Sequence, residues 1–341
     1  MHKFQMNDDK KRLELAILGS VYDLVQFSYD PSERPDFIMR APGTPNQFGV
    51  EITEHFQTES HARGVRVSKY VGRLLEGKPH LHRDDVEALR TAQVSIQDKD
   101  GKLVQAGVPA VISEVAPLEK YVTSLQECVL GKERSAHSYA REDLTHSNLV
   151  VLDHGGRLKI GDGSSLYRSL GSNGFNDRVL DSVFREIFLI TEVEDQRIVY
   201  FPLKQLFAMS DVYMLFRALD TYDNVGFPSN VDDGLRLFAA WYGQKGRTVS
   251  IVHSNGAPVE VLFGNCGFTH SPDSFCVRDY KDAILPQGSS PTLTPAESEF
   301  LRGFEPELDR FRRSHVFQFA CAYDVLRDPP GRGWTAIDKS E

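Results

Sequence analysis

Two short stretches near the N-terminus carry acidic side chains of the kind that hold a divalent metal ion. The first, residues 35–39, begins Pro-Asp and continues with apolar residues, and the second, residues 48–54, has Glu51 near its centre. If the two stretches pair as strands, the carboxylates of Asp36 and Glu51 lie side by side. Two hard oxygen ligands suit Mg²⁺, or Mn²⁺, which completes its coordination with water and phosphate oxygens. The chemistry implied is metal-assisted hydrolysis of a phosphodiester.

The elements that must position these acids can be read from the surrounding pattern. Both stretches are short and rich in β-branched and aromatic residues, and the segment between them holds Pro42, Gly43, Pro45 and Asn46, so we predict two paired strands. Ahead of them, apolar residues recur at helical spacing from Asp9 onward, and acidic residues at 8–9 supply a helix start. Glu14 lies beside the apolar stripe of this helix, where it either turns inward or pairs with a neighbouring lysine on the surface.

The order of these residues resembles a known family. The order is similar to that of the PD-(D/E)XK nuclease superfamily: Glu14 in a leading helix, then Pro35-Asp36, then Glu51-Ile52-Thr53. The sequence of residues 37–54 looks like an uncharacterised bacterial branch of that superfamily. The resemblance covers roughly the first 90 residues. It implies a restriction-endonuclease-like fold in which Asp36 and Glu51 ligate the metal and Glu14 completes the site. It also implies nucleic acid, in particular DNA, as the substrate, and a role in bacterial defence against foreign nucleic acid.

One residue departs from the family pattern. The third motif position is usually Lys, and this chain has Thr53 there. A lysine ammonium stabilises developing charge on the phosphate, whereas a threonine hydroxyl is neutral and can only orient the water or a phosphate oxygen. Glu54 and His55 follow directly, but alternation along a strand points Glu54 away from Glu51. Two hypotheses therefore stay open, a metal-dependent endonuclease and a catalytically inactive nucleic-acid-binding or regulatory module of the same fold.

A basic segment follows the second acidic stretch. Between residues 61 and 83 lie six lysines and arginines against one acid, Glu76. Drawn as one helix, this segment places Arg63, Arg66, Lys69 and Arg73 on a face beside an apolar face made of Val67, Tyr70, Val71, Leu74 and Leu75. A basic face next to a metal site is what phosphate positioning requires, so these four residues are the predicted nucleic-acid contacts. The alternative is an ordinary solvated helix face.

Composition sets the limits on function and location. The chain has 341 residues, 40% hydrophobic and 26% charged, which is typical of a folded globular protein. A formal net charge of −9 argues against nucleic-acid binding over the whole surface and leaves that task to local basic patches. With four scattered cysteines, a polar N-terminus and no apolar run of about 18 residues, we expect a cytoplasmic protein that binds no membrane. A homodimer is compatible with this composition.

The rest of the chain alternates strand and helix patterns, which predicts an α/β or α+β fold with a mixed sheet flanked by helices. We place a nuclease core at 1–203 and an appended α+β region for substrate or partner recognition at 204–341. Strands are expected at 94–97, 110–115, 149–152, 157–160, 186–191, 198–203, 248–253 and 259–263, and helices at 117–130, 204–219 and 231–242. Thr294 and Glu297 form a capping box for a further helix, and Pro306 is expected to begin another that reaches about residue 327.

The middle of the chain also supports a rival interpretation. Asp143 and Asn148, followed by Asp162, resemble the catalytic loop and metal-binding segment of protein kinases, which would make the chain a kinase-like phosphotransferase. Asp162 is followed by Gly163 and Ser164, however, and neither a glycine-rich nucleotide loop nor a strand lysine in a V-A-I-K setting precedes it. The competing interpretation is that these three polar residues form loops and turns.

Overall fold

We analysed a computed structural model of the chain. It describes residues 2–41, 43, 45–67, 69–113, 116–136, 143–155, 170, 174–192, 198–221, 230–253, 257–271, 274–281, 285–314, 323–324 and 334–335. Within this part of the chain the fold is of the mixed α/β class, with a large sheet, a smaller sheet and a two-stranded ribbon. The predicted fold class is confirmed.

The large sheet is built on the two acidic stretches. Strands β1 (Ser28–Pro31), β2 (Phe37–Arg40) and β3 (Gln47–His55) form an antiparallel meander. Strands β6 (Leu144–Asp153) and β7 (Ile187–Glu192) continue the sheet in parallel to β3, and β8 (Ile198–Pro202) and β13 (Tyr323–Asp324) close it in antiparallel fashion. The resulting strand order is β1-β2-β3-β6-β7-β8-β13. The predicted pairing of residues 35–39 with 48–54 is therefore confirmed.

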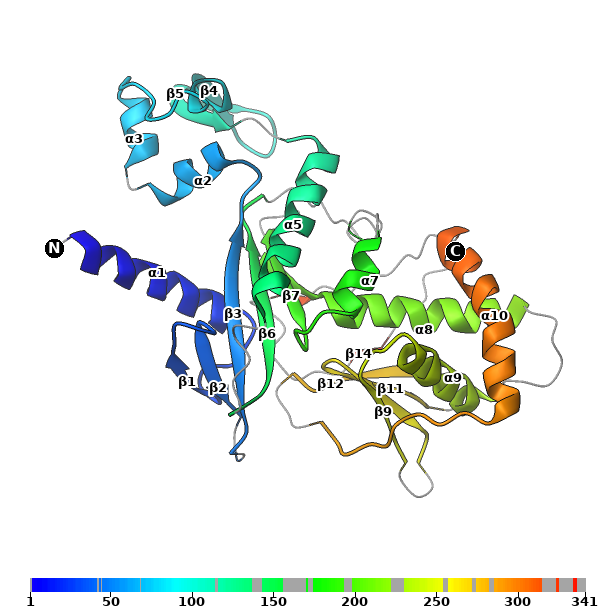
Figure 1. Cartoon of the computed structure of the whole chain (residues 1–341). Helices are drawn as coiled ribbons and strands as arrows, with labels where there is room; N and C mark the ends of the chain where they lie inside the picture. Colours follow the sequence, from blue (N-terminus) through cyan, green and yellow to red (C-terminus); the bar gives the residue numbers. More distant parts are fainter. Residues whose placement is uncertain are drawn as a thin grey trace.

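Helices cover both faces of this sheet (Figure 1). Helix α1 (His2–Gly19) packs through Ile17 and Leu18 into the cluster that contains Val150 of β6. Helix α5 (Leu118–Ala136) belongs to the other cluster, together with Leu149 and Val151. Neighbouring residues of β6 thus alternate between two apolar layers, as expected for a strand buried on both faces.

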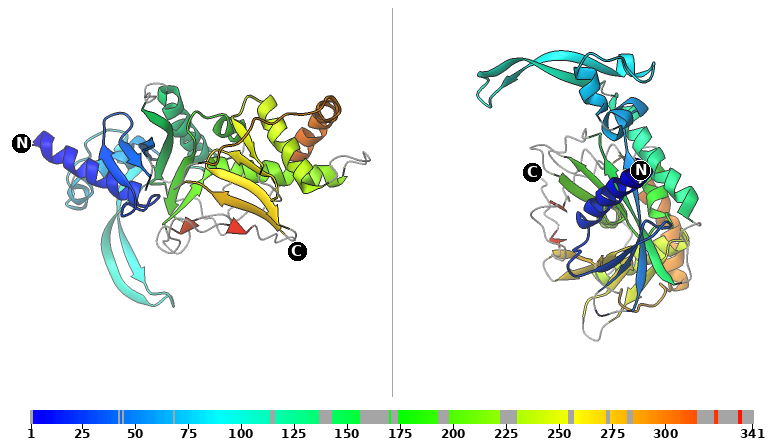
Figure 2. Two further views of the ribbon diagram at one scale, coloured as in Figure 1. Left: turned by 90° about the horizontal axis from the view of Figure 1, so that it is seen from below. Right: turned by 90° about the vertical axis from the view of Figure 1, so that its left-hand side faces the viewer.

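An inserted module separates β3 from α5. It contains helices α2 (Glu59–Arg66), α3 (Tyr70–Leu75) and α4 (Asp85–Ala88), and the antiparallel ribbon of β4 (Leu89–Gln97) and β5 (Leu103–Ser113). Its small core consists of Tyr70, Leu74 and Leu89, with Val111 packed against it. The ribbon stands out from the body in every view (Figures 1 and 2). The strand predicted at 94–97 lies within β4, and the strand predicted at 110–115 overlaps the end of β5.

The C-terminal region packs onto the far end of the large sheet. Helices α7 (Phe175–Leu180), α8 (Leu203–Thr221), α9 (Val231–Gln244) and α10 (Pro295–Ser314) surround a second sheet, ordered β14-β12-β11-β10-β9. Its strands are β9 (Val249–Val252), β10 (Glu260–Phe263), β11 (Cys266–Ser271), β12 (Ser274–Asp279) and β14 (Trp334–Thr335). One hydrophobic cluster runs from α5 through α8 and α9 to α10, so it crosses the predicted boundary at residue 203. In the described ranges, no helix has the length and apolarity needed to cross a membrane.

Three local expectations need correction. The leading helix begins at His2, upstream of the acids predicted to cap it, and ends at Gly19. Pro306 does not begin a helix but lies inside α10, where Leu301, Phe304 and Leu308 on both sides of it are fully buried and hold the helix together. The single basic helix is also wrong, and its breakdown is described with the site. The hairpin partner expected at 157–160 lies outside the described residues.

Candidate functional site

Asp36 and Glu51 meet at the junction of β2 and β3. Phe37 pairs with Val50, so the register continues with Asp36 beside Glu51. The backbone N–H of Ile52 donates a hydrogen bond of 2.8 Å to Asp36 Oδ2 and fixes that carboxylate against β3. Burial, followed by repulsion from the charges of Glu51 and Glu14, raises the pKa of Asp36 from its ordinary 3.8 to about 6. The structure therefore brings three predicted acids into one electrostatic neighbourhood.

Glu14 enters this neighbourhood from α1. Its side chain is buried, yet its carboxylate lies 3.2 Å from the ammonium of Lys10 and 2.8 Å from that of Lys11. The same Lys11 ammonium is 3.8 Å from Asp36 Oδ1. The sequence left two alternatives for Glu14, an inward orientation or a pairing with a neighbouring lysine. The structure combines them, because the side chain is buried and still pairs with Lys10 and Lys11. Among the residues that the structure describes, no three acidic, histidine or cysteine side chains are grouped tightly enough to hold a metal ion.

A glycine in β3 allows the segment before β2 to approach closely. A Cβ atom built on Gly49 would lie 2.5 Å from Cγ of Pro35 and 2.7 Å from Oγ of Ser147, both well inside van der Waals contact. Pro35 is buried and immediately precedes Asp36. The absence of a side chain at Gly49 therefore sets how near Asp36 can come to Glu51.

A lysine that sequence analysis missed completes the charge pattern. Lys132 of α5 places its ammonium 2.6 Å from Oε1 of Glu51, and the Glu51 carboxylate is itself almost fully buried. In the family that the sequence resembles, the corresponding lysine stands at the position of Thr53, two residues further along the same face of β3. In this chain the nearby ammonium group comes instead from Lys132, on a helix that follows the inserted module.

The pairing of Glu51 with Lys132 is one rung of a regular ladder between β3 and α5. Thr53 Oγ1 lies 3.9 Å from Cys128 Sγ, and the imidazole of His55 lies 2.8 Å from Ser124 Oγ. Steps of two along the strand match steps of four along the helix, because both advance by roughly 6 to 7 Å. Thr53 and His55 therefore share the face of Glu51. The spacing Ser-x₃-Cys-x₃-Lys on a predicted helix is the only sequence signal for Lys132, and it is weak.

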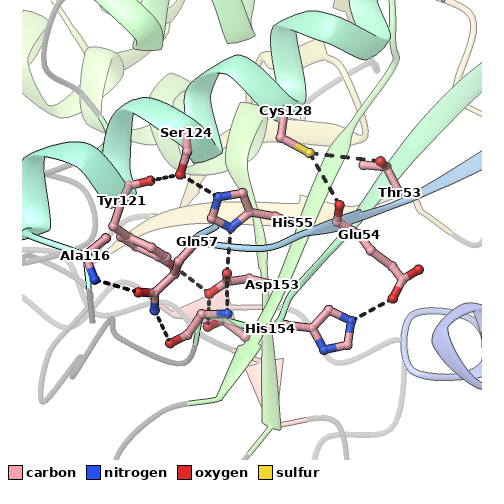
Figure 3. Close-up of polar contacts among 12 residues, drawn as sticks. Thr53, Glu54, His55, Gln57, Ala116, Tyr121, Ser124, Cys128, Asp153 and His154 are labelled. Carbon is pink, nitrogen blue, oxygen red and sulfur yellow. Dashed lines mark hydrogen bonds and ion pairs between the residues drawn. The ribbon is translucent and has the colours of Figure 1, made fainter. Parts of the chain in front are cut away.

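A buried polar network stands behind the ladder (Figure 3). His55 Nδ1 lies 2.8 Å from Asp153 Oδ1, while the hydroxyls of Tyr121 and Thr191 donate to Asp153 Oδ2 at 2.5 and 2.9 Å. The backbone N–H of Gly155 donates to the same carboxylate at 2.8 Å. Although burial acts in the opposite direction, the hydrogen bonds from His55 and Tyr121 lower the pKa of Asp153. This network ties β3, β6, β7 and α5 together beside the candidate site.

Glu54 points to the opposite face of β3, as alternation predicted. Its carboxylate lies 2.8 Å from the imidazole of His154 and 3.1 Å from the guanidinium of Arg66. The ring of Phe56 stacks on His154 with centroids 4.4 Å apart, and Arg66 lies over the same ring at 4.5 Å. The hydrogen bond with His154 lowers the pKa of Glu54. Glu54 is therefore committed to this cluster and does not replace the motif lysine.

The predicted basic face does not exist as drawn. The segment forms two helices, α2 and α3, that are separated at residues 67–69, where Lys69 adopts a left-handed φ of 61°. Val67 and Val71, expected to be buried, are 39% and 38% exposed, so the assumed apolar face is also wrong. A continuous helix fails because the small core of the module selects only Tyr70 and Leu74 from this segment.

The four predicted nucleic-acid contacts have different surroundings. Arg63 is held by Asp84 and Asp85, and Arg66 by Glu54, so two of the four cations are neutralised within the chain. Lys69 is exposed, and Arg73 is half-buried with its Nε lacking a hydrogen-bond partner in the described part of the chain. Lys69 and Arg73 are therefore the two of the four that are not paired with an acid among the described residues, and their contact with nucleic acid stays a prediction.

The kinase-like residues are not presented together from a loop. Asn148 lies inside β6 and is fully buried, where its amide donates to the Tyr22 hydroxyl at 2.7 Å and accepts from the backbone N–H of Glu186 at 3.0 Å. Asp143 lies in a turn just before β6, and Asp162 falls outside the described residues. Asn148 therefore has a structural role in joining the segment that follows α1 to the large sheet.

Comparison with known proteins adds no assignment. No family model, no curated protein and no solved structure matches this chain. The function must accordingly be argued from the site itself.

Proposed function

We propose that the chain is a Mg²⁺-dependent nuclease that hydrolyses phosphodiester bonds of nucleic acid, with DNA as the favoured substrate. The observation that carries this proposal is the meeting of Asp36 and Glu51 across β2 and β3, with the Lys132 ammonium 2.6 Å from Glu51. Two adjacent carboxylates beside a cation are a set of groups suited to metal-assisted phosphodiester hydrolysis. Membership of the PD-(D/E)XK superfamily is part of the same proposal.

The residues present fit a hard divalent cation. Oε2 of Glu51 is buried and has no hydrogen-bond partner within the described ranges, which leaves one oxygen available for a ligand. Burial raises the pKa of Asp36 even though the Lys11 ammonium lies 3.8 Å away, so a bound cation would further stabilise the ionised carboxylate. Mg²⁺ is commonly held by only one or two protein carboxylates, so the lack of a third close ligand is compatible with this ion.

Each residue has a distinct task in this proposal. Asp36 and Glu51 would hold Mg²⁺ (or Mn²⁺), and Glu14 would act as a further acidic group near it. When bound, the ion would supply Lewis-acid activation of water and charge neutralisation at the scissile phosphate. Lys132 would donate to a phosphate oxygen or to the attacking water and stabilise the charge that develops on the phosphate. The Thr53 hydroxyl, on the same face, would orient one of these oxygens.

Contacts with the substrate backbone would come from the inserted module. Lys69 is exposed and Arg73 is half-buried there, whereas Arg63 and Arg66 are held by acids of the chain. Lysines and arginines that contact phosphates contribute affinity that falls with salt concentration but carry no sequence information. We therefore expect weak, salt-sensitive binding from this module.

A matched pair of variants on β3 tests the proposal. Glu51→Gln should abolish cleavage of plasmid and of single-stranded DNA in Mg²⁺ or Mn²⁺. Glu54→Gln makes the same chemical change on the opposite face and should leave cleavage within a few fold of wild type. Cleavage that survives in Glu51→Gln would exclude this mechanism.

The same experiment decides between the enzyme and an inactive binding module. Lys10 and Lys11 both pair with Glu14, and Lys11 also approaches Asp36, so lysines now neutralise the charge that a metal would neutralise. If wild type binds DNA but cuts none in either metal, the chain is a binding or regulatory module of this fold.

A further inference from the structure

A basic cavity lies away from the acidic site, where the large sheet faces the second sheet. It has a volume of about 520 Å³ and is bounded by the start of β6, the segment between α7 and β7, and the region from α9 to β10. A second cavity of about 260 Å³ adjoins it and reaches Phe48 at the start of β3. Thr145, His146, Arg185 and Leu285 line both cavities. Their combined size is that of a site for a small organic ligand.

Arg185 stands in the wall shared by the two cavities, with the carboxylates of Asp279 and Glu186 close enough to act on its charge. Its Nε donates to the carbonyl of Gly264 at 3.2 Å and its Nη2 to the carbonyl of Tyr280 at 3.4 Å, while Nη1 lies 3.3 Å from His146 Nε2. Among the described residues, no carboxylate hydrogen-bonds this guanidinium. Burial lowers the pKa of Arg185, which shows that its positive charge is poorly solvated. A buried cation in this state favours an anion beside it.

His146 cannot share the positive charge. Its ring stacks on Phe48 with centroids 5.0 Å apart, and burial together with the charge of Arg185 lowers its pKa to about 3. At neutral pH the imidazole is therefore uncharged. Its Nδ1 lies 2.9 Å from Thr145 Oγ1, whose hydroxyl donates to the carbonyl of Gln47, so Nδ1–H donates to Thr145 and Nε2 accepts from Arg185. His146 thus fixes one end of the guanidinium, and the remaining N–H groups of Arg185 are the donors suited to an oxyanion.

Two further cations line the larger cavity at depth. Lys204 is 5% exposed and donates to the backbone carbonyl of Ser182 at 2.6 Å. Arg247 is 7% exposed and pairs with Asp177 and Asp181, but its Nη1 is buried with no hydrogen-bond partner in the described ranges and lies 3.9 Å from Asp211. Unused donors on buried cations are uncommon in folded proteins, because leaving them unpaired costs about 1 to 3 kcal/mol each.

We infer that this cavity binds a phosphate-bearing small molecule of nucleotide size, with its phosphates on Arg185 and its apolar part against Val183 and Leu285. Val183 is 58% exposed and lines the larger cavity, and Leu285 is half-buried and lines both cavities. Planar guanidinium groups match phosphate oxygens in two-point hydrogen bonds. The site does not depend on the proposed nuclease activity, since none of its residues belongs to the acidic site.

The test uses an exposed residue of the cavity wall, so that folding is not at risk. Thr248 lines the larger cavity and is exposed. Thr248→Glu places a negative charge there, and Thr248→Gln is its neutral match. Binding of ATP, AMP and inorganic phosphate to the full chain is measured by calorimetry and by thermal shift with EDTA present, which excludes the metal site. Arg185→Gln and Glu51→Gln are measured in parallel, with circular dichroism to confirm folding.

The expected result is that wild type, Thr248→Gln and Glu51→Gln bind ATP and AMP with similar affinity. Thr248→Glu should bind about tenfold more weakly or worse, equivalent to ~1.4 kcal/mol, and folded Arg185→Gln should lose binding. No binding of any probe to wild type overturns the inference. Equal binding by Thr248→Glu, or binding of inorganic phosphate alone, overturns it as well. Binding of a single-stranded oligonucleotide but of no nucleotide would overturn it by assigning the cavity to a polymer.

Discussion

Replacing Asp36 by Asn should make the protein more stable at neutral pH while removing the proposed metal site. Burial and the nearby charges of Glu51 and Glu14 raise the pKa of Asp36 from 3.8 to about 6, so ionising this carboxyl destabilises the folded state. Each pKa unit corresponds to about 1.4 kcal/mol, and the difference between the two values gives about 3 kcal/mol as an upper limit. Asn can still accept the hydrogen bond from Ile52 N, so the substitution removes the charge and keeps the contact.

The pH dependence of this gain has a definite sign. The folded state binds the Asp36 proton more tightly than the unfolded chain, so this residue's contribution to wild-type stability declines as pH rises from about 4 to about 6. Asp36→Asn lacks that decline. The difference in unfolding free energy between variant and wild type should be near zero at about pH 4 and reach its maximum above about pH 6. Urea unfolding of both proteins across this range measures it, and the contributions of groups that do not interact with Asp36 cancel in the difference.

Magnesium provides the second arm of the same experiment. A ligand that binds only the folded state stabilises it in proportion to the logarithm of its concentration above Kd, so Mg²⁺ should raise the melting temperature of wild type and not of Asp36→Asn. Asp30→Asn is the control, since Asp30 is exposed and pairs with Arg40 at the surface, where such a pair contributes little. An Asp36→Asn protein that is no more stable than wild type at neutral pH, or that Mg²⁺ stabilises equally, would refute the reasoning.

Three further outcomes follow from the site geometry. Lys132→Met should lower cleavage by about a hundredfold, and adding Thr53→Lys should restore part of it because both positions flank Glu51; an unchanged rate in Lys132→Met would contradict this. Asp153→Asn should reduce the unfolding free energy by about 3 kcal/mol in urea titrations. Because the pKa of Asp153 is lowered, this contribution is lost from wild type only as pH falls below 3.8, and an unaltered urea midpoint at neutral pH would disprove it. Gly49→Ala should weaken Mg²⁺-induced stabilisation and reduce the unfolding free energy by about 1 to 3 kcal/mol. Gly72→Ala, with nothing within 4 Å of its added Cβ, should be tolerated. Equal melting temperatures of the two variants would argue against the close approach of Pro35 to Gly49.

Local patterns in the sequence predicted the part of the fold that carries the acids. Alternation and a turn-rich gap were enough to pair β2 with β3, because adjacent strands joined by a short loop need no information from elsewhere in the chain. The capping box was also correct, since the backbone N–H of Thr294 donates to the Glu297 carboxylate at 2.7 Å and the backbone N–H of Glu297 donates to Thr294 Oγ1 at 3.2 Å at the start of α10. Both features depend on residues only a few positions apart.

The features that sequence analysis missed depend on distant contacts. Lys132 is separated from Glu51 by 81 positions and by the whole inserted module, so no local spacing reports their contact. Arg63 was predicted as a phosphate contact because its partners, Asp84 and Asp85, lie just beyond residues 61–83, the segment whose charges led to that prediction. A run of basic residues shows where the positive charges lie in the sequence, but only the structure shows which of them are paired with acids.

The position of Lys132 bears on whether Thr53 marks a decayed site. Catalysis requires a positive charge at a point in space near the scissile phosphate, and it does not matter which backbone segment carries that charge. The ladder between β3 and α5 puts the ammonium on the face shared by Glu51 and Thr53, within direct contact of the Glu51 carboxylate. A buried glutamate opposite a lysine, beside an aspartate that is costly to ionise, is the kind of arrangement found at functional sites as well as in structural ion pairs. The proposal of an active enzyme predicts that the exchange of Lys132 and Thr53 changes the cleavage rate, whereas an inactive module predicts no cleavage in any of these variants.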